Sequence, residues 1–484
     1  MAIGEWRLAH ADWVPGRIES GFMFRTLVLF AAAIVAVSAA QAPAPRTVSL
    51  VVTNGIVVTV DASRRVIERG AVAIDGRDIV AVDTAAAIAA RFRGRATVDA
   101  AGGVIMPGLV NTHTHAPMVL FRGLADDLAL MDWLQKYIFP AEARTVTPEF
   151  VRAGTRLAAL EMIESGTTTY ADMYYFEEEI ARVTRAAGLR GVLGETIIQF
   201  PVPGAKTPAE GLARVERFAK EFAGDELITA AVAPHAMYTL DPDTLKACRA
   251  LADRLRIPVI IHLAETKDEI KTSADKYRAT PTAFLESLGF WGPRTLAAHG
   301  VHLTPADIAI LASRGVGLAH NPESNMKLAS GISPVEAMQK AGIAVGLGTD
   351  GAASNNDLDM FEAMRQAAFL HKLNDGDPRA VSASVALAMA TIDGARALGM
   401  DKEIGSLEAG KRADLLVVSM SSARQTPMYD PVSHLVYVTR GDDVRTTVVN
   451  GNVLMRDRKV LTLEAPAVLA EARAFAEKVR AAIK

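Results

Sequence analysis

The sequence lacks the features of several protein classes. It has one cysteine, Cys248, in 484 residues, which excludes an internal disulfide framework and any site built from paired cysteines. Aromatic residues make up only 6% and the net charge is −3, so neither a stacking surface nor a basic surface for nucleic acid is predicted. Half of the residues are hydrophobic, as in globular proteins. We expect a folded protein that does not bind nucleic acid, with Cys248 buried on a helix.

The hydrophobic run near the N-terminus is too short for a comfortable membrane span. Residues 27–37 are eleven apolar residues that follow Arg25, whereas a spanning helix needs about 20. An Ala-Gln-Ala motif follows, so residues 1–42 are predicted to be a secretory signal peptide and the mature protein to be periplasmic or secreted. Met23 is the expected start, which makes residues 1–22 an upstream overrun. An uncleaved membrane anchor is the alternative, and no membrane association is expected after cleavage.

Both ends of the remaining chain are rich in short strand patterns separated by turn signals. Asn54-Gly55, Asp75-Gly76 and Asn450-Gly451 predict tight hairpins, because both central residues of such a turn adopt positive φ. The same pattern at both ends suggests one shared domain. We therefore expect residues 46–105 and 405–460 to form a small β-sandwich domain together.

The middle of the chain, residues 106–404, alternates between apolar strand patterns and helical patterns. Eight such units over roughly 300 residues predict an α/β fold, a (β/α)8 TIM-like barrel, which commonly takes about 250 residues. A doubly wound sheet is the structural alternative. The Ala-rich residues 461–484 predict a C-terminal helix. The eight strands are expected to end near His115, Asp172, Glu195, Pro234, His262, His299, His320 and Asp350.

Ionisable residues at these strand ends predict a metal site. His113 and His115 are two residues apart, so on a strand both side chains point to one face and can reach one metal ion. Two histidines at this spacing, without further ligands, are often only structural. His262, His299 and Asp350 end three other predicted strands, however, and the carboxyl ends of barrel strands meet at one face. Imidazoles with one carboxylate suit Zn²⁺, with Fe²⁺ as the alternative.

Several stretches around these residues resemble the amidohydrolase superfamily, and within it the 5-methylthioadenosine/S-adenosylhomocysteine deaminases. The resemblance extends over about residues 51–460. It implies a hydrolytic deaminase that releases ammonia from an aminated heterocycle, foremost a 6-aminopurine nucleoside such as adenosine, 5-methylthioadenosine or S-adenosylhomocysteine. The matching stretches are residues 107–115, 165–169, 233–239, 262–266, 320–322, 324–328 and 348–351.

The resemblance also implies a role for each site residue. Asp350 would accept a proton from water as well as bind the metal. Glu265, three residues after His262, would pass that proton to a ring nitrogen, because attack on an amidine-like carbon needs this nitrogen protonated. His299 would orient or polarise the attacking hydroxide. The implied metal ligands are His113, His115, His262 and Asp350.

One absence limits the number of metal ions. Two-metal members of the superfamily use a lysine at the end of the fourth strand, whereas here that strand ends Pro234-His235, so one metal per chain is expected. The resemblance implies that His235, Trp133 and Glu142 contact the substrate. Trp133 would pack against a ring face, and Glu142 would hydrogen-bond the ribose hydroxyls. The alternatives are a structural histidine, a core tryptophan and a solvated helix-cap glutamate. His302 and His320 are assigned to loop or supporting positions; the histidines without a motif, expected at the surface, are His10, His371 and His434.

Recognition of a charged substrate tail is the point at which the sequence departs from the family. Relatives that act on S-adenosylhomocysteine use arginines after the third strand, but residues 195–207 contain no arginine, and Lys206 is the only cation there. A bidentate anchor for a carboxylate is therefore missing. We expect adenosine or 5-methylthioadenosine to be deaminated faster than S-adenosylhomocysteine.

Two other functional interpretations remain. The chain could be a hydrolase of another ring substrate, such as guanine, cytosine, a pterin or a chloro-triazine, or a binding protein without activity. Glu265 favours deamination, because a binding protein has no need of an acid/base group beside a metal and related chlorohydrolases can lack it. The expected partner is a small molecule, and a homo-oligomer is left open.

Overall fold

The computed structural model describes residues 44–483. The predicted signal peptide over residues 1–42 and the start at Met23 lie outside the described residues, as does His10. Within residues 44–483, no helix combines the length and the apolarity needed to cross a membrane. The domain boundaries expected above remain predictions, and the bounds given below are those of the individual elements.

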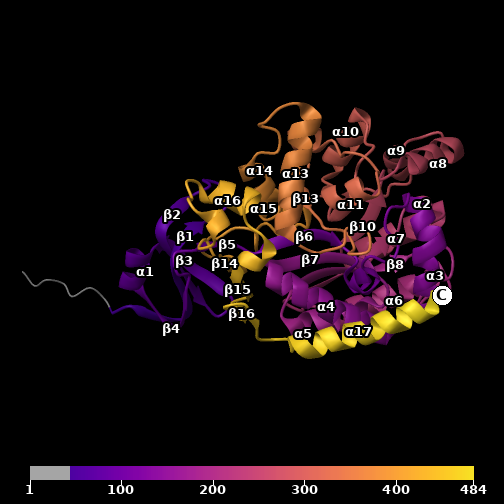
Figure 1. The fold of residues 1–484 in the computed structure, drawn as a ribbon. Coiled ribbons are helices and arrows are strands. Elements are labelled where there is room, and N and C mark those ends of the chain that lie inside the picture. The colour runs from indigo at the N-terminus through magenta and orange to yellow at the C-terminus, as the bar shows by residue number, and fades with distance from the viewer. Residues whose placement is uncertain (1–43, 484) are drawn as a thin grey trace, which may run out of the picture. The chain divides into compact units, whose positions relative to one another are not determined.

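Eight parallel strands form a nearly closed barrel in chain order, β6 to β13 (Figure 1). The first and last strands meet, because the Thr112 hydroxyl donates to the Leu347 carbonyl at 2.8 Å and the Asp350 amide donates to the His113 carbonyl at 2.9 Å. The predicted TIM-like barrel is confirmed. The strands are β6 (Leu109–Thr114), β7 (Thr167–Tyr174), β8 (Arg190–Ile197), β9 (Ile228–Pro234), β10 (Val259–Leu263), β11 (Thr295–His299), β12 (Gly317–His320) and β13 (Val345–Leu347).

The helices between these strands lie outside the barrel (Figure 1). Several begin with the same signal, a Thr or Asp whose side chain accepts an N–H of the first turn, followed by proline. Thr147 caps α4 in this way and Asp241 caps α7. The helices of the barrel are α4 (Pro148–Ser165), α5 (Glu177–Ala187), α6 (Pro208–Glu221), α7 (Pro242–Leu255), α8 (Lys267–Tyr277), α9 (Pro281–Ser287), α10 (Pro305–Arg314), α11 (Pro322–Lys327), α12 (Val335–Lys340), α13 (Met360–Asp375), α14 (Ala383–Met389) and α15 (Ile392–Ala397).

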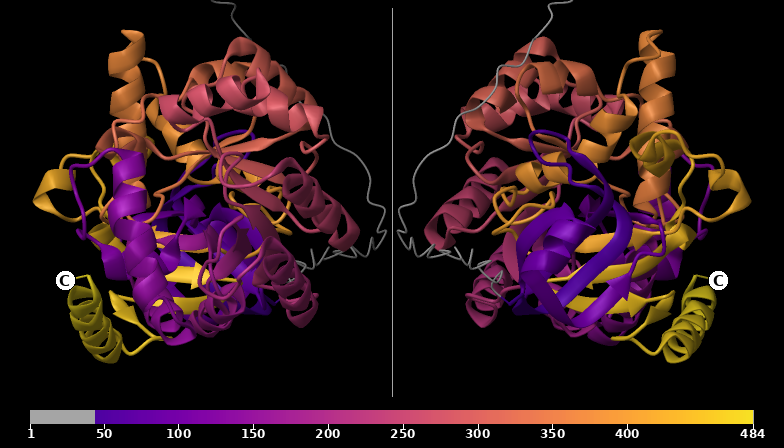
Figure 2. Two further views of the ribbon diagram at one scale, coloured as in Figure 1. Left: turned by 90° about the vertical axis from the view of Figure 1, so that its right-hand side faces the viewer. Right: turned by 90° about the vertical axis from the view of Figure 1, so that its left-hand side faces the viewer.

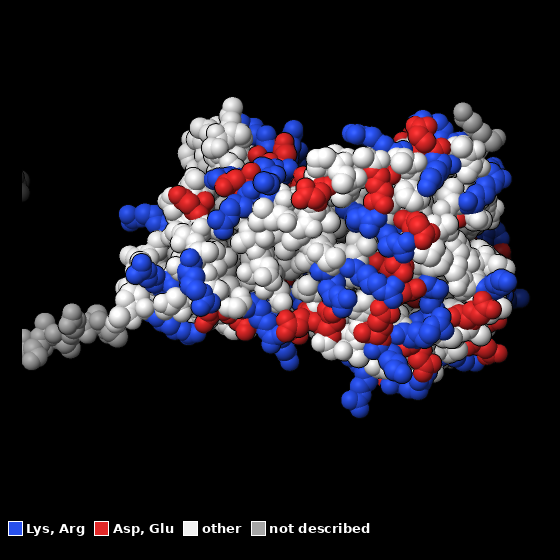
Figure 3. All heavy atoms as spheres, turned by 90° about the horizontal axis from the view of Figure 1, so that it is seen from below, with Lys and Arg blue, Asp and Glu red and all other residues white. Residues whose placement is uncertain are grey.

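The connection from β6 to α4 is longer than the others and contains only short helical pieces. They are η1 (Ala116–Phe121), α2 (Leu130–Trp133), the π-helix η2 (Leu134–Ile138) and α3 (Phe139–Thr145). At the other end of the chain, α17 (Ala465–Ala482) is the predicted C-terminal helix and lies on the outer surface (Figure 2). The Arg156 guanidinium of α4 pairs with the Glu471 carboxylate of α17 at 2.6 Å. Charges of both signs are interspersed over the face shown in Figure 3.

A second, mixed sheet of nine strands joins the two ends of the chain (Figure 2). Strand β5 of the N-terminal part pairs with β14 of the C-terminal part, with Val104 opposite Val418 and Pro107 opposite Leu415. Both chain ends therefore share one sheet, as predicted. Its strands are β1 (Arg46–Val58), β2 (Val66–Asp75), β3 (Asp78–Thr84), β4 (Phe92–Asp99), β5 (Val104–Pro107), β14 (Leu415–Val418), β15 (Val444–Val449), β16 (Asn452–Arg456) and β17 (Lys459–Val460). The accompanying helices are α1 (Ala85–Arg91), η3 (Ala423–Gln425), α16 (Pro431–Tyr437) and η4 (Gly441–Asp443).

One of the three predicted hairpins is wrong. Asp75-Gly76 connects β2 to β3 and Asn450-Gly451 connects β15 to β16, as predicted. Asn54-Gly55 instead lies inside the single strand β1, where the register against β2 shifts between Val52 and Gly55. Asn54 has φ 61°, which suits a β-bulge as well as a turn. Gly55 is needed for close packing, because a Cβ there would lie 2.7 Å from the Gly103 carbonyl oxygen.

Candidate active site

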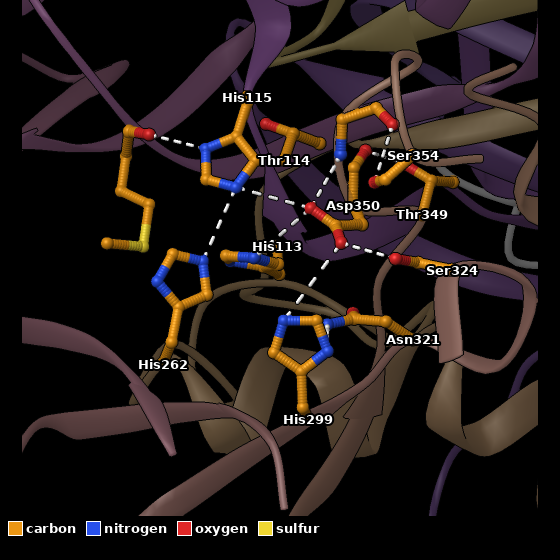
Figure 4. Close-up of polar contacts among 12 residues, drawn as sticks. His113, Thr114, His115, His262, His299, Asn321, Ser324, Thr349, Asp350 and Ser354 are labelled. Carbon is orange, nitrogen blue, oxygen red and sulfur yellow. Dashed lines mark hydrogen bonds and ion pairs between the residues drawn. The ribbon is translucent and has the colours of Figure 1, made fainter. Parts of the chain in front are cut away.

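Five of the predicted site residues meet at the carboxyl end of the barrel. His113 lies in β6 and His115 directly follows it, His262 lies in β10, His299 ends β11, and Asp350 follows β13. Their side chains converge on one space (Figure 4). One potential ligand atom from each of His113, His115 and His262 lies within 4.8 Å of the others, and the same holds for His113, His299 and Asp350. We call these five residues the strand-end cluster.

Hydrogen bonds orient the imidazoles of the strand-end cluster toward one another. The Nδ1 atom of His115 lies 2.6 Å from the Met173 carbonyl, and that of His262 lies 2.8 Å from the His235 carbonyl. Each Nδ1 therefore donates a proton to a carbonyl, and the Nε2 of the neutral His262 keeps its lone pair. Burial lowers the pKa of His115, but its contact with Asp350 raises this pKa to about 9, so the Nε2 of His115 also holds a proton. These two Nε2 atoms face each other at 3.4 Å. A divalent cation bound between these two Nε2 atoms would displace the proton of His115.

His113 and His262 support a metal rather than a proton. Burial lowers the pKa of His113 to about 4 and holds that of His262 well below its usual value, so both rings are neutral. Neither ring nitrogen of His113 has a hydrogen-bond partner among the described residues, although the ring is fully buried. A buried nitrogen without a partner is costly unless a ligand occupies its lone pair. A donor set of imidazoles and one carboxylate fits a divalent metal such as zinc, whose binding releases the proton of His115.

Asp350 is the carboxylate of the strand-end cluster. Its Oδ1 lies 3.2 Å from the Nε2 of His115 and 3.5 Å from the Nε2 of His113. The Ser324 hydroxyl donates to Oδ2 at 2.7 Å, and the Gly351 amide donates to Oδ1 at 2.7 Å. Burial opposes ionisation, but the contacts with the two histidines hold the pKa of Asp350 well below its usual value. Asp350 is therefore an ionised carboxylate that can bind a cation and accept a proton.

Unusual backbone conformations occur beside the cluster. His299 has φ 74°, Asp350 has φ 61°, and Ala264, between His262 and Glu265, has φ 50°. Residues other than glycine rarely adopt positive φ, and such strain gathers at functional sites where the surrounding fold enforces it. These conformations turn the chain directly after three barrel strands. They are a second indication, independent of residue type, that this end of the barrel is functional.

Glu265 lies beside the cluster and is buried with 5% of its surface exposed. Its Oε2 lies 3.8 Å from the Nε2 of His299, and burial raises its pKa. Glu269 positions it, because this carboxylate accepts the backbone N–H groups of Ala264 and Glu265, both at 2.9 Å. The sequence analysis missed Glu269, although its place in the first turn of α8 is typical of such an N-terminal acceptor. A buried carboxyl whose neutral form is favoured in this way is suited to deliver a proton to a bound molecule.

His299 is oriented from the side away from Glu265. Its Nδ1 lies 2.9 Å from the Oδ1 of Asn325 and 3.3 Å from the Nδ2 of Asn321, so two amide side chains hold this edge of the ring. The Nε2 then faces the site, 4.0 Å from the Oδ2 of Asp350. Asn325 and Ser324 both belong to α11, so one short helix supports two groups of the site. The motif at residues 324–328 was noted in the sequence without a role for these two side chains.

A cavity opens from the cluster and brings in the three predicted substrate-contacting residues, Trp133, Glu142 and His235. Trp133 is 6% exposed and lines the cavity rather than serving only as a core residue. Glu142 is 4% exposed, so it is not a solvated helix cap. Burial raises the pKa of Glu142 to about 7, and the Tyr175 hydroxyl donates to its carboxylate at 3.5 Å. Tyr174 and Tyr175, which the sequence analysis missed, complete this side of the cavity.

His235 lies beside the metal-binding groups without being one of the clustered ligands. Its ring centroid lies 4.8 Å from that of His262, and burial lowers its pKa to about 3. The ring lines the cavity, and its Nδ1 lies 3.2 Å from the Thr239 hydroxyl. A neutral imidazole at this position can donate to or accept from a bound molecule.

Two other histidines form a buried pair, which corrects one prediction. His371 was expected at the surface but is 1% exposed, and its Nε2 lies 3.1 Å from the Nε2 of His320 at the end of β12. The signal for burial was present, since Met360, Met364 and Ala367 precede His371 at helical spacing and are buried with it. His302 lies in the loop after β11 as predicted, with its Nε2 2.9 Å from the Ser330 carbonyl.

The cations near the cavity differ from the one singled out in the sequence. Lys206 does not line the cavity. A groove shares Leu134, Phe139 and Tyr238 with the cavity, and Lys276 from α8 and Asp241 line this groove. Among the described residues, no carboxylate lies within 4.0 Å of the Lys276 ammonium. The lysine that lines this groove is therefore Lys276 and not Lys206.

Comparison with known proteins agrees with this geometry. The 5-methylthioadenosine/S-adenosylhomocysteine deaminase of Syntrophobacter fumaroxidans is 48% identical over 431 residues, 89% of this chain and 98% of that protein. The 5′-deoxyadenosine deaminase of Methanosarcina barkeri is 46% identical and covers 89% and 98%. A crystal structure of an adenosine deaminase from Xanthomonas campestris with bound zinc has a TM-score of 0.89 at 41% identity, covering 90% of this chain and 100% of that one. The amidohydrolase family model matches residues 104–454, and the chain belongs to the amidohydrolase family.

Proposed function

We propose that this chain is a metal-dependent hydrolytic deaminase that removes the 6-amino group of a purine nucleoside and releases ammonia. One observation carries the proposal: a buried acid, Glu265, lies beside a cluster of metal-binding side chains at the base of a cavity that also contains Trp133 and Glu142. The names of the relatives at 44–48% identity support the reaction and the class of substrate.

One divalent metal per chain fits the strand-end cluster. His113, His115, His262 and Asp350 would hold it, and zinc is favoured because the similar adenosine deaminase was crystallised with zinc. A divalent metal lowers the pKa of water toward 7 and so makes a nucleophile available at neutral pH. Strand β9 ends at Pro234, with His235 next and no lysine to bridge a second ion. This supports a mononuclear site.

The chain's own residues divide the movement of protons between them. The Asp350 carboxylate accepts a proton from the attacking water, because its low pKa keeps it ionised and the Ser324 hydroxyl holds it in place. The Glu265 carboxyl, whose pKa burial raises, delivers its proton to the ring nitrogen next to the carbon under attack. Asp350 then passes the proton from water to the amino group, which leaves as ammonia, and the hydroxyl left on the carbon returns a proton to Glu265. The Nε2 of His299 faces both carboxyl groups and orients the water between them.

The cavity walls favour a nucleoside over a bare base. Trp133 provides an apolar face, and Glu142 provides a buried carboxylate that can accept hydrogen bonds from two ribose hydroxyls. A base without ribose would leave Glu142 without a partner from the substrate. Adenosine, 5-methylthioadenosine and S-adenosylhomocysteine all carry the two hydroxyls, so their 5′ groups decide the order among them.

Release of ammonia, and of chloride from the chloro-triazine, over a panel of compounds tests the proposal. Adenosine, 5-methylthioadenosine and S-adenosylhomocysteine are compared with guanine, cytosine, a pterin and a chloro-triazine. Deamination of a purine nucleoside at least tenfold above every other ring, by kcat/KM, is the expected result. Turnover of only a free base, a pterin or a chloro-triazine would overturn the nucleoside proposal and favour another ring hydrolase of the same family.

We also propose that the protein is exported and that its mature chain begins near Pro43. The apolar run after Arg25 and the Ala-Gln-Ala motif before Pro43 support this proposal. N-terminal sequencing of protein from the native host, after separation of periplasm from cytosol, provides the test. A chain that begins at Met1 or Met23 in the cytosolic fraction would contradict export.

A further inference from the structure

Residues 123–138 form a segment that covers the cavity and that we call the cover segment. It runs from Gly123, after η1, to the end of η2, and it includes the two short helices α2 and η2. It belongs to neither sheet, so no strand pairing holds it to the barrel. Four of its side chains nevertheless line the cavity. They are Leu130, Trp133, Leu134 and Ile138.

The polar attachment of the cover segment is concentrated in one residue. Within residues 123–138, Asp126 is the only side chain with a hydrogen bond or ion pair to another part of the described chain. Its Oδ1 accepts from the Lys327 ammonium at 2.6 Å, and its Oδ2 accepts from the Asn356 amide at 3.3 Å. The other ion pair of the segment, Lys136 with Asp132, is internal.

Lys327 is held firmly enough to serve as an anchor. Besides Asp126, its ammonium donates to the Ala353 carbonyl at 3.3 Å and to the Asn356 side-chain oxygen. All three N–H groups thus have acceptors, and the side chain is only 20% exposed. The lysine ends α11, the helix whose Ser324 and Asn325 contact Asp350 and His299. The ammonium also keeps the pKa of Asp126 below its usual value.

The backbone around Asp126 bends on both sides. Gly123 has φ 69° and Asp127 has φ 62°, so the chain turns before and after the anchored carboxylate. The path from Asp127 to Trp133 therefore starts from a point fixed by Lys327. Without that anchor, apolar packing alone would hold residues 127–138, and one end of the packed stretch would be free to move.

We propose that Lys327 is a positioning residue whose ion pair with Asp126 fastens the cover segment over the cavity and thereby sets the affinity for substrate. Lys327 does not contact the reacting atoms, and it does not line the cavity. Its effect passes through the cover segment to Trp133. The kinetic part of this inference rests on the proposed function, whereas the mobility of the cover segment can be measured without any substrate.

The test removes the ion pair from either side. Lys327→Met and Asp126→Asn are each expected to raise KM for 5-methylthioadenosine about tenfold with kcat changed less than twofold, because a charge-assisted hydrogen bond of a partly exposed pair is lost. The double variant should show no more than the larger single effect, since both changes break one interaction. Lys136→Met is the matched control, because it removes the internal ion pair of the same segment and should leave KM within twofold.

Hydrogen exchange provides the readout that is independent of catalysis. Amides of residues 123–138 should exchange at least fivefold faster in Lys327→Met and Asp126→Asn than in the wild type, with β10 and β11 unchanged. Unchanged exchange in this segment would overturn the proposal. So would a fall in kcat at constant KM, which would place the effect of Lys327 on α11 and its contacts with Asp350 and His299. If the wild type deaminates no nucleoside but exchange still increases, only the proposed function fails.

Discussion

The strand-end cluster and the cover segment face the same cavity but are supported in different ways. The cluster is carried by β10 and β11, which pair with parallel strands on both sides, and by β6 and the turn after β13, where the first and last barrel strands meet. The cover segment has no strand pairing, and one side chain, Asp126, carries its polar attachment to the rest of the described chain. The groups proposed for chemistry therefore lie on the rigid part of the fold, while Trp133 lies on a part that can move.

The two regions differ in how much movement their function allows. Metal ligands and proton-transfer groups must be held within fractions of an ångström, which a strand ladder provides. A substrate must also enter and leave, which a segment held by one ion pair and apolar packing permits. Changes in the cluster should therefore abolish turnover, whereas changes in the cover segment and the cavity wall should alter KM and selectivity.

The largest expected effect follows loss of a metal ligand. His262→Ala is expected to lose both metal and turnover, because the remaining imidazoles cannot complete the donor set. Metal analysis of wild-type protein purified without chelator should give about one equivalent per chain. His235→Gln, at the neighbouring position, should keep its metal. Two equivalents in the wild type, or full metal content in His262→Ala, would contradict the assigned ligands.

Loss of the acid should be nearly as severe but should leave the metal in place. Glu265→Gln is expected to lower kcat by about 10²- to 10⁴-fold, because the amide cannot deliver a proton. Metal content should match that of the wild type. Glu286→Gln, which alters a partly exposed glutamate paired with Arg314 far from the site, serves as the control. Near-normal turnover or lost metal in the Glu265 variant would show that its role is different.

A smaller effect is expected at the cavity wall, where it should depend on pH. Glu142 has a pKa of about 7, and it faces Tyr174, Tyr175 and His115. Below that pH the carboxyl is protonated and loses acceptor capacity for ribose hydroxyls, so KM for the nucleoside should fall as the pH rises through about 7. Glu142→Gln should raise KM roughly tenfold at pH 8 and remove this pH dependence. Steady-state kinetics of the wild type and Glu142→Gln from pH 5.5 to 8.5 test this prediction. A pH dependence of KM that is retained in the variant would exclude Glu142 as its cause.

The smallest effect is expected in the groove beyond the cavity. Lys276→Met should lower kcat/KM for S-adenosylhomocysteine about threefold to tenfold and leave 5-methylthioadenosine unaffected, because only the former carries a carboxylate and the lysine is exposed. Lys206→Met should leave kcat/KM unchanged for both substrates. In the wild type, 5-methylthioadenosine should remain the faster substrate. A tenfold preference for S-adenosylhomocysteine would refute the argument from the missing arginine.

The strand ends could be predicted because parallel barrel strands are buried on both faces. Such strands are continuous apolar runs, and His262 or His299 at the end of one stands out. The ambiguity at Asn54-Gly55 is physical, since positive φ serves a bulge as well as a turn. His371 was missed because one polar residue on a buried helical face resembles a surface residue unless the helical period is followed.

Other parts of the site could not be predicted, because they depend on how distant loops meet. Ser324 contacts Asp350 only because α11 folds back across the barrel end, and Lys327 meets Asp126 across 201 positions of the sequence. No sequence pattern near these residues predicts either contact. Glu269 differs, since its contact with the amides of Ala264 and Glu265 is local and typical of a helix N-terminus.

The pairing of β5 with β14 has a consequence for how the chain folds. Pro107 and Leu415 lie opposite each other, so the nine-stranded sheet cannot be completed until the last strands have left the ribosome. Until then one edge of β5 is an unpaired strand edge, which favours association with other chains. Chains that stop before Leu415 should aggregate rather than fold, even though the barrel strands and the strand-end cluster are already complete.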